Sequence, residues 1–516
     1  MKKKTFYITT PIYYPSGRLH IGHLFTTTLA WVYKNYKKQQ GYDTFFITGI
    51  DEHGQKIQKK ALELNINPQE YVDQEAKQFE KLWDLLLIDY DAFNRTTNKN
   101  HQKAIQLIFN KMLEKGYIYM GSYEGLYSIS DEEFLTKNQA IFKDNKYFHP
   151  VSGTELQEIK EESYFFDVKK FAPWIKSFFT NNPNFISNSA TYKELLNNFI
   201  NKGLENLSIT RVSFDWGIPI SSTKGTKNQH VIYVWLDALF NYLTFLGFLS
   251  ENDSKYQKYW ENGDERVHLL AKEISRFHAI YWPVFLKSLD LKLPTKEIIH
   301  SWIITPEGKM SKSRGNVIDP IPLIEKYGAE EIKYFFISQI NIDNDFAFSE
   351  ELLVNVLNAD LANNFGNLLN RTIKMINQSF EFGTEYKLND LQEIDNNVFV
   401  MIRNIYQDYK NEFDNFHADK ALKKAIELSK KLNEYIDKNE PWKLKEDIQR
   451  LNVVLNTLQN GIYAVSYMLS SVIPNKMKSV LDFLKISDFN EKNLFDWTKF
   501  DKKGPVATEI LFPRIK

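Results

Sequence analysis

The beginning of the chain alternates between strand-like and helix-like sequence, and this alternation constrains the fold more than any other feature. Residues 5–9 and residues 44–48 are β-branched and aromatic, which is typical of buried strands. Between them, apolar residues recur at helical spacing from Leu24 to Gly41, and a second helix is predicted to begin near Gln55. The order strand, helix, strand, helix predicts an α/β fold with a parallel sheet, whose ligands bind at the carboxyl ends of the strands.

The tetrapeptide His20-Ile21-Gly22-His23 lies where the first predicted strand gives way to the first predicted helix. A helix N-terminus offers unpaired backbone N–H groups and the positive end of the helix dipole. Gly22 removes a side chain that would block a close ligand, and two imidazoles one turn apart add hydrogen-bond donors. We therefore expect a phosphate site here. The alternative for His20 is a plain helix cap.

Composition narrows the class of protein. Lys and Arg together number 65, as do Asp and Glu, so the net charge gives no sign of a nucleic-acid partner. The chain has no cysteine, which excludes disulfides, thiolate zinc sites and a cysteine nucleophile. We find no signal peptide, and the best membrane candidate, residues 231–249, contains Asp237 and Asn241, which favours a buried helix. We expect a cytoplasmic protein without a membrane segment.

A second element typical of phosphate binding lies at residues 308–315, Gly-Lys-Met-Ser-Lys-Ser-Arg-Gly. Small residues and glycines bracket three cations in a stretch that fits neither the helical nor the strand period, so we predict a mobile loop. Taken alone, such a run is more often a solvated basic turn, because short lysine runs are common.

The two elements together are far more specific than either alone. Histidines that open a helix near the N-terminus, paired with Lys-Met-Ser-Lys-Ser after the second half of the sheet, resemble the class I aminoacyl-tRNA synthetases over nearly the whole chain. Other segments resemble the methionyl-tRNA synthetase family within that class. These segments are residues 9–17, 49–54, 234–238, 276–278, 281–283 and 309–316.

The resemblance implies a methionine–tRNA ligase, which activates L-methionine with ATP to methionyl-adenylate and pyrophosphate and then transfers methionine to tRNA(Met). A carboxylate is already nucleophilic at neutral pH, so the reaction needs positioning and charge neutralisation. We therefore expect His20, His23, Lys309 and Lys312 to be catalytic, and Mg²⁺ to bind the β- and γ-phosphates. The implied ATP site comprises His20, Gly22, His23, Glu273, Met310 and Lys312.

Methionine presents an apolar side chain with one soft sulfur atom, which packs well against aromatic ring edges. Asp51 is expected to bind the substrate ammonium, and its position just beyond a predicted strand agrees with this role. Ile274, His278 and Trp282 are spaced by four residues, so they share a helix face, although a plain core face is the alternative. The implied methionine-binding residues are Ile12, Tyr14, Asp51, Trp235, Ala238, Leu239, Tyr242, Ile274, His278 and Trp282.

Residues 361–372 predict a helix with one apolar face and, opposite to it, a strip formed by Asn363, Asn367 and Arg371. By resemblance this strip binds the CAU anticodon, and Trp442 stacks on an unstacked base. A solvated helix face is the alternative. The implied partners are thus L-methionine and both initiator and elongator tRNA(Met).

Two departures from the family pattern are visible. Many relatives carry cysteine zinc knuckles, but this chain has no cysteine, so we expect no zinc and no metal site held by the protein itself. The chain has Ala271-Lys272-Glu273 where the family usually has Gly-Lys-Asp, at positions associated with the ATP ribose. Arg211 matches a family arginine near the active site, but the sequence supplies no role for it.

The changes in sequence rhythm and the resemblance together predict a Rossmann-type catalytic domain with a parallel sheet, interrupted by an inserted α+β subdomain and followed by an α-helical bundle. The chain ends soon after the bundle, without an appended oligonucleotide-binding domain, so we expect a monomer. The predicted parts are the first catalytic half (1–115), the connective-peptide insertion (116–230), the second catalytic half (231–300), the KMSKS loop and stem-contact region (301–354) and the helical anticodon-binding domain (355–516).

Two other functions stay open at this point. A nucleotidylyltransferase of the His-x-Gly-His type also uses paired histidines on a parallel sheet, although it would not need a helical bundle with an Asn-Asn-Arg strip. A non-catalytic tRNA-binding paralogue would keep the bundle and lose the phosphate-binding residues.

Overall fold

The computed structural model describes the chain in two compact units. Unit 1 comprises residues 1–30, 43–84 and 88–302, and unit 2 comprises residues 31–42, 85–87 and 303–516. The description leaves out residues 1, 16, 18, 129–132, 136, 138–139, 151–152, 221–227, 306–307, 310–315 and 501–508, and the side chains of residues 123, 133, 134 and 309.

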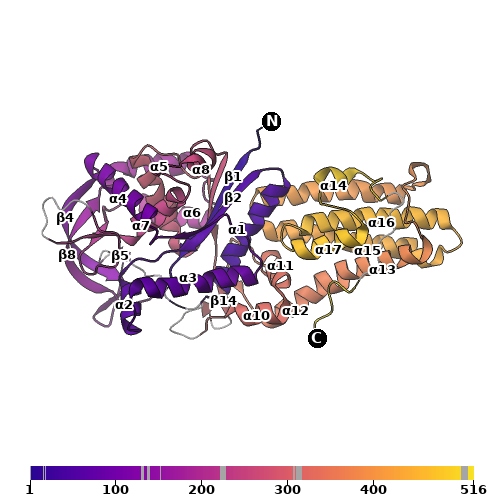
Figure 1. The fold of residues 1–516 in the computed structure, drawn as a ribbon, viewed down its shortest axis with the longest axis horizontal. Coiled ribbons are helices and arrows are strands. Elements are labelled where there is room, and N and C mark those ends of the chain that lie inside the picture. Colours follow the sequence, from indigo (N-terminus) through magenta and orange to yellow (C-terminus); the bar gives the residue numbers. More distant parts are fainter. Residues whose placement is uncertain are drawn as a thin grey trace. The chain divides into compact units, whose positions relative to one another are not determined.

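The centre of unit 1 is a five-stranded parallel sheet in the order β13-β12-β1-β2-β3, and its strands β1 and β2 are labelled in Figure 1. The central strand β1 (Thr5–Tyr13) pairs with β2 (Asp43–Ile50) and β12 (Glu265–Ala271), and the edges are β3 (Ala92–Arg95) and β13 (Lys296–His300). Eight of the nine residues of β1 are buried, as expected for a parallel strand covered on both faces. The predicted α/β fold with a parallel sheet is confirmed.

A bulge in β1 directs the side chains before and after it to different helices. The Tyr7 hydroxyl donates to the Tyr242 carbonyl at 2.7 Å and so fixes α7 (Val234–Thr244) against β1. Tyr13, six residues later, instead stacks on Phe79 of α3 (Pro68–Leu85) with ring centroids 5.7 Å apart. Because side chains alternate along a strand, Tyr7 and Tyr13 would share a face without the register shift between Thr9 and Ile12.

The remaining helices of unit 1 connect or cover the strands (Figure 1). Helix α1 (Ile21–Gln39) begins directly after His20, as predicted, and its residues from Trp31 onward belong to unit 2. The others are α2 (Gln55–Glu63), α4 (Lys99–Glu114), α8 (Ser254–Tyr256), α9 (Trp282–Ser288), the 3₁₀-helix η4 (Lys272–Ile274) and the π-helices η3 (Gln257–Glu261) and η5 (Phe277–Tyr281).

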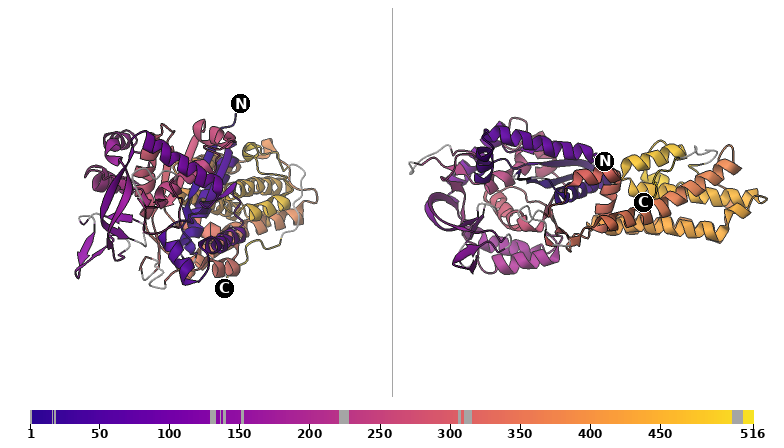
Figure 2. Two further views of the ribbon diagram at one scale, coloured as in Figure 1. Left: turned by 60° about the vertical axis from the view of Figure 1, so that its left-hand side comes forward. Right: turned by 90° about the horizontal axis from the view of Figure 1, so that it is seen from below.

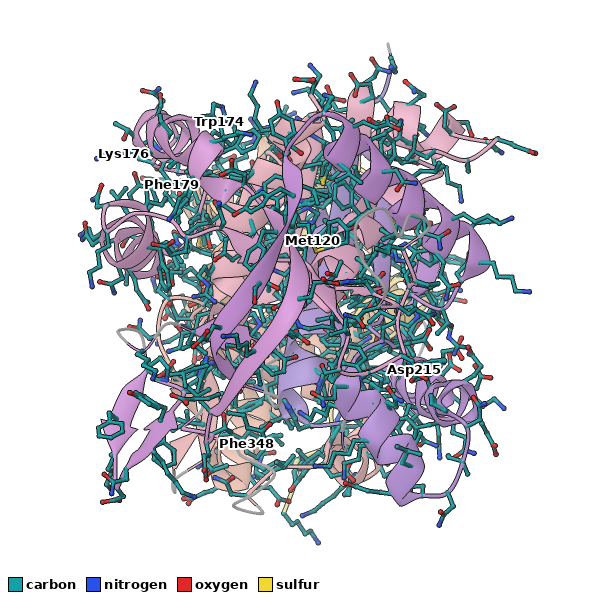
Figure 3. The ribbon with its side chains drawn as sticks, turned by 90° about the vertical axis from the view of Figure 1, so that its left-hand side faces the viewer. Met120, Trp174, Lys176, Phe179, Asp215 and Phe348 are labelled. Carbon is teal, nitrogen blue, oxygen red and sulfur yellow. The ribbon has the colours of Figure 1, made fainter. Side chains whose placement is uncertain are left out.

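The inserted segment is built on two long strands. Strands β4 (Ile118–Ser128) and β8 (Gln157–Phe166) form one antiparallel ribbon, on which Met120 is labelled in Figure 3. The aromatic and turn residues from about Gly116 to His230 predict short strands, and this is wrong for β4 and β8, which span 11 and 10 residues. The other strands are β5 (Glu133–Leu135), β6 (Ile141–Lys143), β7 (Lys146–Phe148), β9 (Leu207–Ser208), β10 (Thr210–Arg211) and β11 (Val231–Ile232).

The same segment also contains helices. They are η1 (Val168–Phe171), α5 (Ala172–Asn181), α6 (Ser189–Leu195) and the π-helix η2 (Leu196–Ile200). Trp174 and Phe179 are labelled on α5 in Figure 3. The segment that begins at Val231 forms β11 and α7, and none of the described helices is long and apolar enough to span a bilayer.

Unit 2 begins with a small sheet, β15-β14-β16, made of β14 (Ile303–Thr305), β15 (Gly308–Lys309) and β16 (Phe346–Ala347). We predicted a loop from residue 308, and this is wrong for Gly308 and Lys309, whose backbone pairs antiparallel with β14. Met310 and Lys312 lie outside the described residues. Two helices follow, α10 (Pro320–Tyr327) and α11 (Ala329–Gln339).

The rest of unit 2 is a helical bundle, as predicted, and its long helices run side by side in Figures 1 and 2. Helix α16 (Ile448–Leu469) lies at its centre, since every residue from Val453 to Leu469 is buried. The other helices are α12 (Glu350–Val356), the π-helix η7 (Leu357–Gly366), α13 (Asn367–Ser379), η8 (Leu388–Asp390), α14 (Glu393–Asp414), α15 (Ala418–Asn439), η9 (Pro441–Lys443), α17 (Pro474–Leu484) and η10 (Glu491–Phe495).

Candidate active site

The paired histidines at the start of α1 are bound by their own backbone. The Gly22 N–H donates to His20 Nδ1 at 3.0 Å, and the His20 N–H donates to His23 Nδ1 at 3.1 Å. A nitrogen that accepts such a bond carries no proton, so both imidazoles are neutral and hold their proton on Nε2. His20 thus caps the helix, which was our alternative for it, and both rings are half-buried.

Gly22 is required by this arrangement. A Cβ at residue 22 would lie 2.8 Å from Nδ1 and Cε1 of His20, so any side chain there would displace the imidazole. His23 in turn lies against Tyr13, whose ring centroid is 5.1 Å away at a steep angle, and against Phe79 at 5.9 Å. The two imidazoles are therefore fixed in position by the backbone, the glycine and neighbouring rings.

A cluster of rings joins α7 to the helix formed by η5 and α9. His278 Nδ1 donates to the Ile274 carbonyl at 3.1 Å, which leaves Nε2 to accept the Tyr242 hydroxyl at 2.8 Å. Burial lowers the pKa of His278 to about 4 and raises the pKa of Tyr242, so both groups are neutral. The ring centroid of Trp282 lies 6.0 Å from that of Tyr242, and Trp235 meets the edge of His278 at 6.1 Å.

Beneath this cluster lies His268 of β12, which we did not single out from the sequence. Trp282 Nε1 donates to His268 Nε2 at 3.1 Å, so His268 Nδ1 carries the proton and donates to Thr9 Oγ1 at 2.8 Å. Burial holds the pKa of His268 well below its usual range. A histidine in the apolar run of β12 was the only sequence signal for it. The cluster is therefore polar in composition but carries no charge.

The structure brings together five of the ten residues predicted to bind methionine, namely Trp235, Tyr242, Ile274, His278 and Trp282. Ala238 and Leu239 are buried on the same helix α7, and Tyr14 packs at the margin of the same hydrophobic core. Asp51 follows the end of β2 and is 8% exposed, while half-buried Ile12 pairs with Gly49 in the sheet. No contact that places Ile12 in the ring cluster is found among the described residues.

Glu273 takes a different path from the one expected. Its exposed carboxylate accepts the indole N–H of Trp302 at 2.7 Å, and Lys272 Nζ lies 3.8 Å from the centroid of the Trp302 ring. The side chains of Lys272 and Glu273 therefore both contact the indole of Trp302.

Arg211, which had no role assigned from the sequence, is a buried structural residue. It is 1% exposed, and its Nη1 donates to the Thr210 carbonyl at 2.6 Å and to Ser208 Oγ at 3.1 Å. Its guanidinium lies 4.2 Å from the Tyr233 ring centroid, and Nε is 3.9 Å from Glu161. Arg211 thus holds the inserted strands against the start of α7.

The strip predicted on residues 361–372 is arranged largely as expected. The opposite face, Leu361, Phe365, Leu368 and Thr372, is buried. Asn363 and Asn367 are exposed, and the guanidinium of half-buried Arg371 lies 5.6 Å from the ring of Trp442, which is 43% exposed. The helix is a π-helix as far as Gly366, a form that is frequent at functional sites.

The described residues contain no group of three or more His, Asp or Glu side chains placed to hold a metal ion. Two buried clusters of titratable groups were also not predicted. One is Glu52 with Arg95, and the other is Asp237 between His53 and His101. Each of these pairings joins residues that are 43 or more positions apart, which explains why local spacing did not reveal them.

Comparisons with known proteins agree with this geometry. The family described as "tRNA synthetases class I (M)" matches residues 6–144 and 146–373. The methionine–tRNA ligase of Mycoplasmopsis pulmonis is 54% identical over the full length of both chains. That of Bacillus subtilis is 42% identical, over 100% of this chain and 78% of its own length.

Solved structures give the same result. The Mycobacterium tuberculosis methionyl-tRNA synthetase in complex with methionyl-adenylate superposes with a TM-score of 0.92 at 29% identity, covering 99% of this chain and 100% of that one. These matches span both units. The chain therefore belongs to the methionyl-tRNA synthetase family of the class I aminoacyl-tRNA synthetases.

Proposed function

We propose that this chain catalyses the reaction of its family: activation of L-methionine with ATP, followed by transfer of the methionyl group to tRNA(Met). The observation that carries the proposal is the uncharged ring cluster of Tyr242, His278 and Trp282 in the unit that also presents two Nε2–H imidazoles. An apolar thioether needs shape and polarizable neighbours, whereas a nucleotide needs fixed hydrogen-bond donors.

Methionine is proposed to bind with its ammonium on Asp51 and its side chain against the rings of α7, η5 and α9. Because the Tyr242 hydroxyl donates to His278 Nε2, neither of these two polar groups needs a hydrogen bond from an apolar thioether that binds beside them. The full proposed set is Ile12, Tyr14, Asp51, Trp235, Ala238, Leu239, Tyr242, Ile274, His278 and Trp282.

ATP is proposed to bind at the start of α1, where the Nε2–H groups of His20 and His23 and the helix dipole favour phosphate oxygens. These donors are already oriented by their Nδ1 bonds, so they stabilise the charge that develops as pyrophosphate leaves. Lys309 and Lys312 are proposed to neutralise charge during the reaction, and Met310 and Lys312 are proposed to bind ATP, as their motif implies. Glu273 is kept as a proposed ribose ligand, because its carboxylate can accept a ribose hydroxyl in addition to the Trp302 indole N–H.

Mg²⁺ is proposed to be held by the β- and γ-phosphates of ATP, where it supplies charge neutralisation, because Mg²⁺ prefers phosphate oxygens and water to a protein cage. The expectation of no zinc stays a prediction.

The tRNA is proposed to bind through Asn363, Asn367, Arg371 and Trp442, with Trp442 stacking on an anticodon base. The position of the Arg371 guanidinium beside the Trp442 ring supports a joint role for these two residues. Use of both initiator and elongator tRNA(Met), and a monomeric state, stay predictions.

The predicted division of the chain is kept as part of the proposal. Residues 1–115 and 231–300 form the catalytic domain, and residues 116–230 form the connective-peptide insertion. Residues 301–354 carry the KMSKS segment, and residues 355–516 bind the anticodon.

The decisive test of the reaction is exchange of labelled pyrophosphate into ATP. We expect exchange that depends on added methionine, because the carboxylate of the amino acid is the nucleophile. A nucleotidylyltransferase would exchange only when supplied with its own acceptor for the nucleotidyl group, with or without methionine, and a non-catalytic tRNA-binding paralogue would not exchange at all. Either result would reject the proposed activity.

Tyr242→Phe should raise the KM for methionine by about tenfold, because it leaves the buried His278 Nε2 without a donor, at a cost of about 1–3 kcal/mol. The KM for ATP should not change. Tyr409→Phe is the matched control, since the buried Tyr409 hydroxyl donates to the Met468 carbonyl at 2.8 Å within unit 2. An unchanged KM for methionine in the Tyr242 variant would contradict the proposed role of Tyr242 in methionine binding.

Trp442→Ala should lower kcat/KM for tRNA charging by about 5- to 100-fold and leave pyrophosphate exchange unchanged. The expected loss corresponds to the stacking of one base on an aromatic ring. Trp442→Phe should retain most of the charging activity, because it keeps a ring to stack on. Equal charging by the Ala variant and the unmodified chain would contradict the anticodon role.

A further inference from the structure

The residues that follow β2 are held by hydrogen bonds from both their backbone and their side chains. The Asp51 N–H donates to the Tyr13 carbonyl at 2.9 Å. The next side chain, Glu52, is fully buried, and its carboxylate accepts Arg95 Nε at 2.8 Å. The backbone that carries the Asp51 carboxylate is therefore fixed to β1 and to the edge strand β3 of the sheet.

His53 provides the link to α7. His53 Nδ1 lies 2.6 Å from Oδ2 of Asp237, and His101 Nε2 lies 2.6 Å from Oδ1 of the same carboxylate. The three side chains are 3%, 2% and 1% exposed. Burial alone would raise the pKa of Asp237, but the charges and hydrogen bonds of the two imidazoles outweigh it and hold that pKa below its usual range. The carboxylate is thus ionised, and both imidazoles must donate to it.

The two histidines tie Asp237 to different parts of unit 1. His53 lies two residues after Asp51, so its bond joins the proposed ammonium site to α7, the helix that carries Trp235, Ala238, Leu239 and Tyr242. His101 lies in α4, which carries none of the proposed substrate-binding residues, and its other ring nitrogen lies 2.7 Å from Thr244 Oγ1. The same carboxylate therefore joins α7 to the Asp51 segment through His53 and to α4 through His101, and only the first of these links connects two groups of proposed substrate-binding residues.

We infer that His53 is a positioning residue, whose hydrogen bond to Asp237 sets the separation between the Asp51 carboxylate and the ring-lined pocket on α7. Methionine must reach both groups at once, with its ammonium at one end and its thioether at the other. A small displacement of Asp51 relative to α7 therefore weakens methionine binding, while ATP, which contacts neither group, is unaffected. The inference rests on the proposed methionine activation.

The test compares variants at the two histidines in methionine-dependent pyrophosphate exchange, with thermal unfolding measured in parallel. His53→Leu removes the donor and should raise the KM for methionine by about tenfold, with the KM for ATP within about twofold of the unmodified chain. His53→Asn should restore a KM near the original, because its amide nitrogen takes the place of Nδ1. His53→Gln, whose amide lies one bond farther out, should not.

His101 is the matched control, since it has the same carboxylate partner, the same distance and the same burial. His101→Leu should lower the unfolding temperature about as much as His53→Leu and leave the KM for methionine unchanged. If His53→Leu does not fold, the His53→Asn and His53→Gln pair gives the same comparison.

Three results would overturn the inference. One is a normal KM for methionine in both His53→Leu and His53→Gln. Another is an equal rise in that KM in the two leucine variants, which would assign the effect to the buried carboxylate as a whole. Absence of exchange by the unmodified chain would overturn the proposed function and this inference with it, whereas the first two results leave the proposed function standing.

Discussion

Two backbone N–H groups at the start of α1, each donating to an imidazole Nδ1, are the interaction on which the candidate ATP site depends. They fix the neutral form of His20 and His23, the nitrogen that carries the proton and the orientation of each ring. The same bonds use donors that every helix leaves unpaired at its N-terminus. Helix capping and the proposed ligand binding are therefore compatible here, since the cap uses Nδ1 and leaves the proton of each ring on Nε2.

The central strand connects this site to the ring cluster. Before its bulge, β1 supports the cluster, because Tyr7 donates to the backbone of α7 and Thr9 accepts a hydrogen bond from His268. After the bulge, Tyr13 packs against His23. One strand therefore supports both the residues proposed to bind the nucleotide and those proposed to bind the amino acid, as expected for a site at the carboxyl ends of parallel strands.

The sequence predicted most clearly those features that depend on local order. The parallel sheet, the start of α1 directly after His20 and the buried face from Leu361 to Thr372 followed from periodicity and turn chemistry. Short strands were predicted in the insertion, yet β4 pairs with β8 from Ile118 to Tyr127, because two glycines are tolerated in a strand with a continuous partner. Residue 309 was predicted in a loop, yet its backbone pairs with β14, a short tertiary contact that no period reveals.

The part of the site that could not be predicted is its network of distant polar pairs. His53 and His101 meet Asp237 across 184 and 136 positions, and each residue alone has ordinary neighbours in the sequence. The neutrality of His268 and His278 likewise follows from burial and partners, which only the folded chain supplies. Residue types near the substrate were therefore predictable, while the hydrogen bonds that hold them in place were not.

The ¹⁵N spectrum of histidine-labelled protein reports directly on the paired imidazoles, with the signals of His20 and His23 assigned by their loss in single glutamine variants. Both rings should be neutral with the proton on Nε2, and their Nε2 signals should shift when ATP is added with methioninol, which lacks the reacting carboxylate. Rings protonated on Nδ1, or Nε2 signals that ignore the nucleotide, would contradict the proposed ATP site.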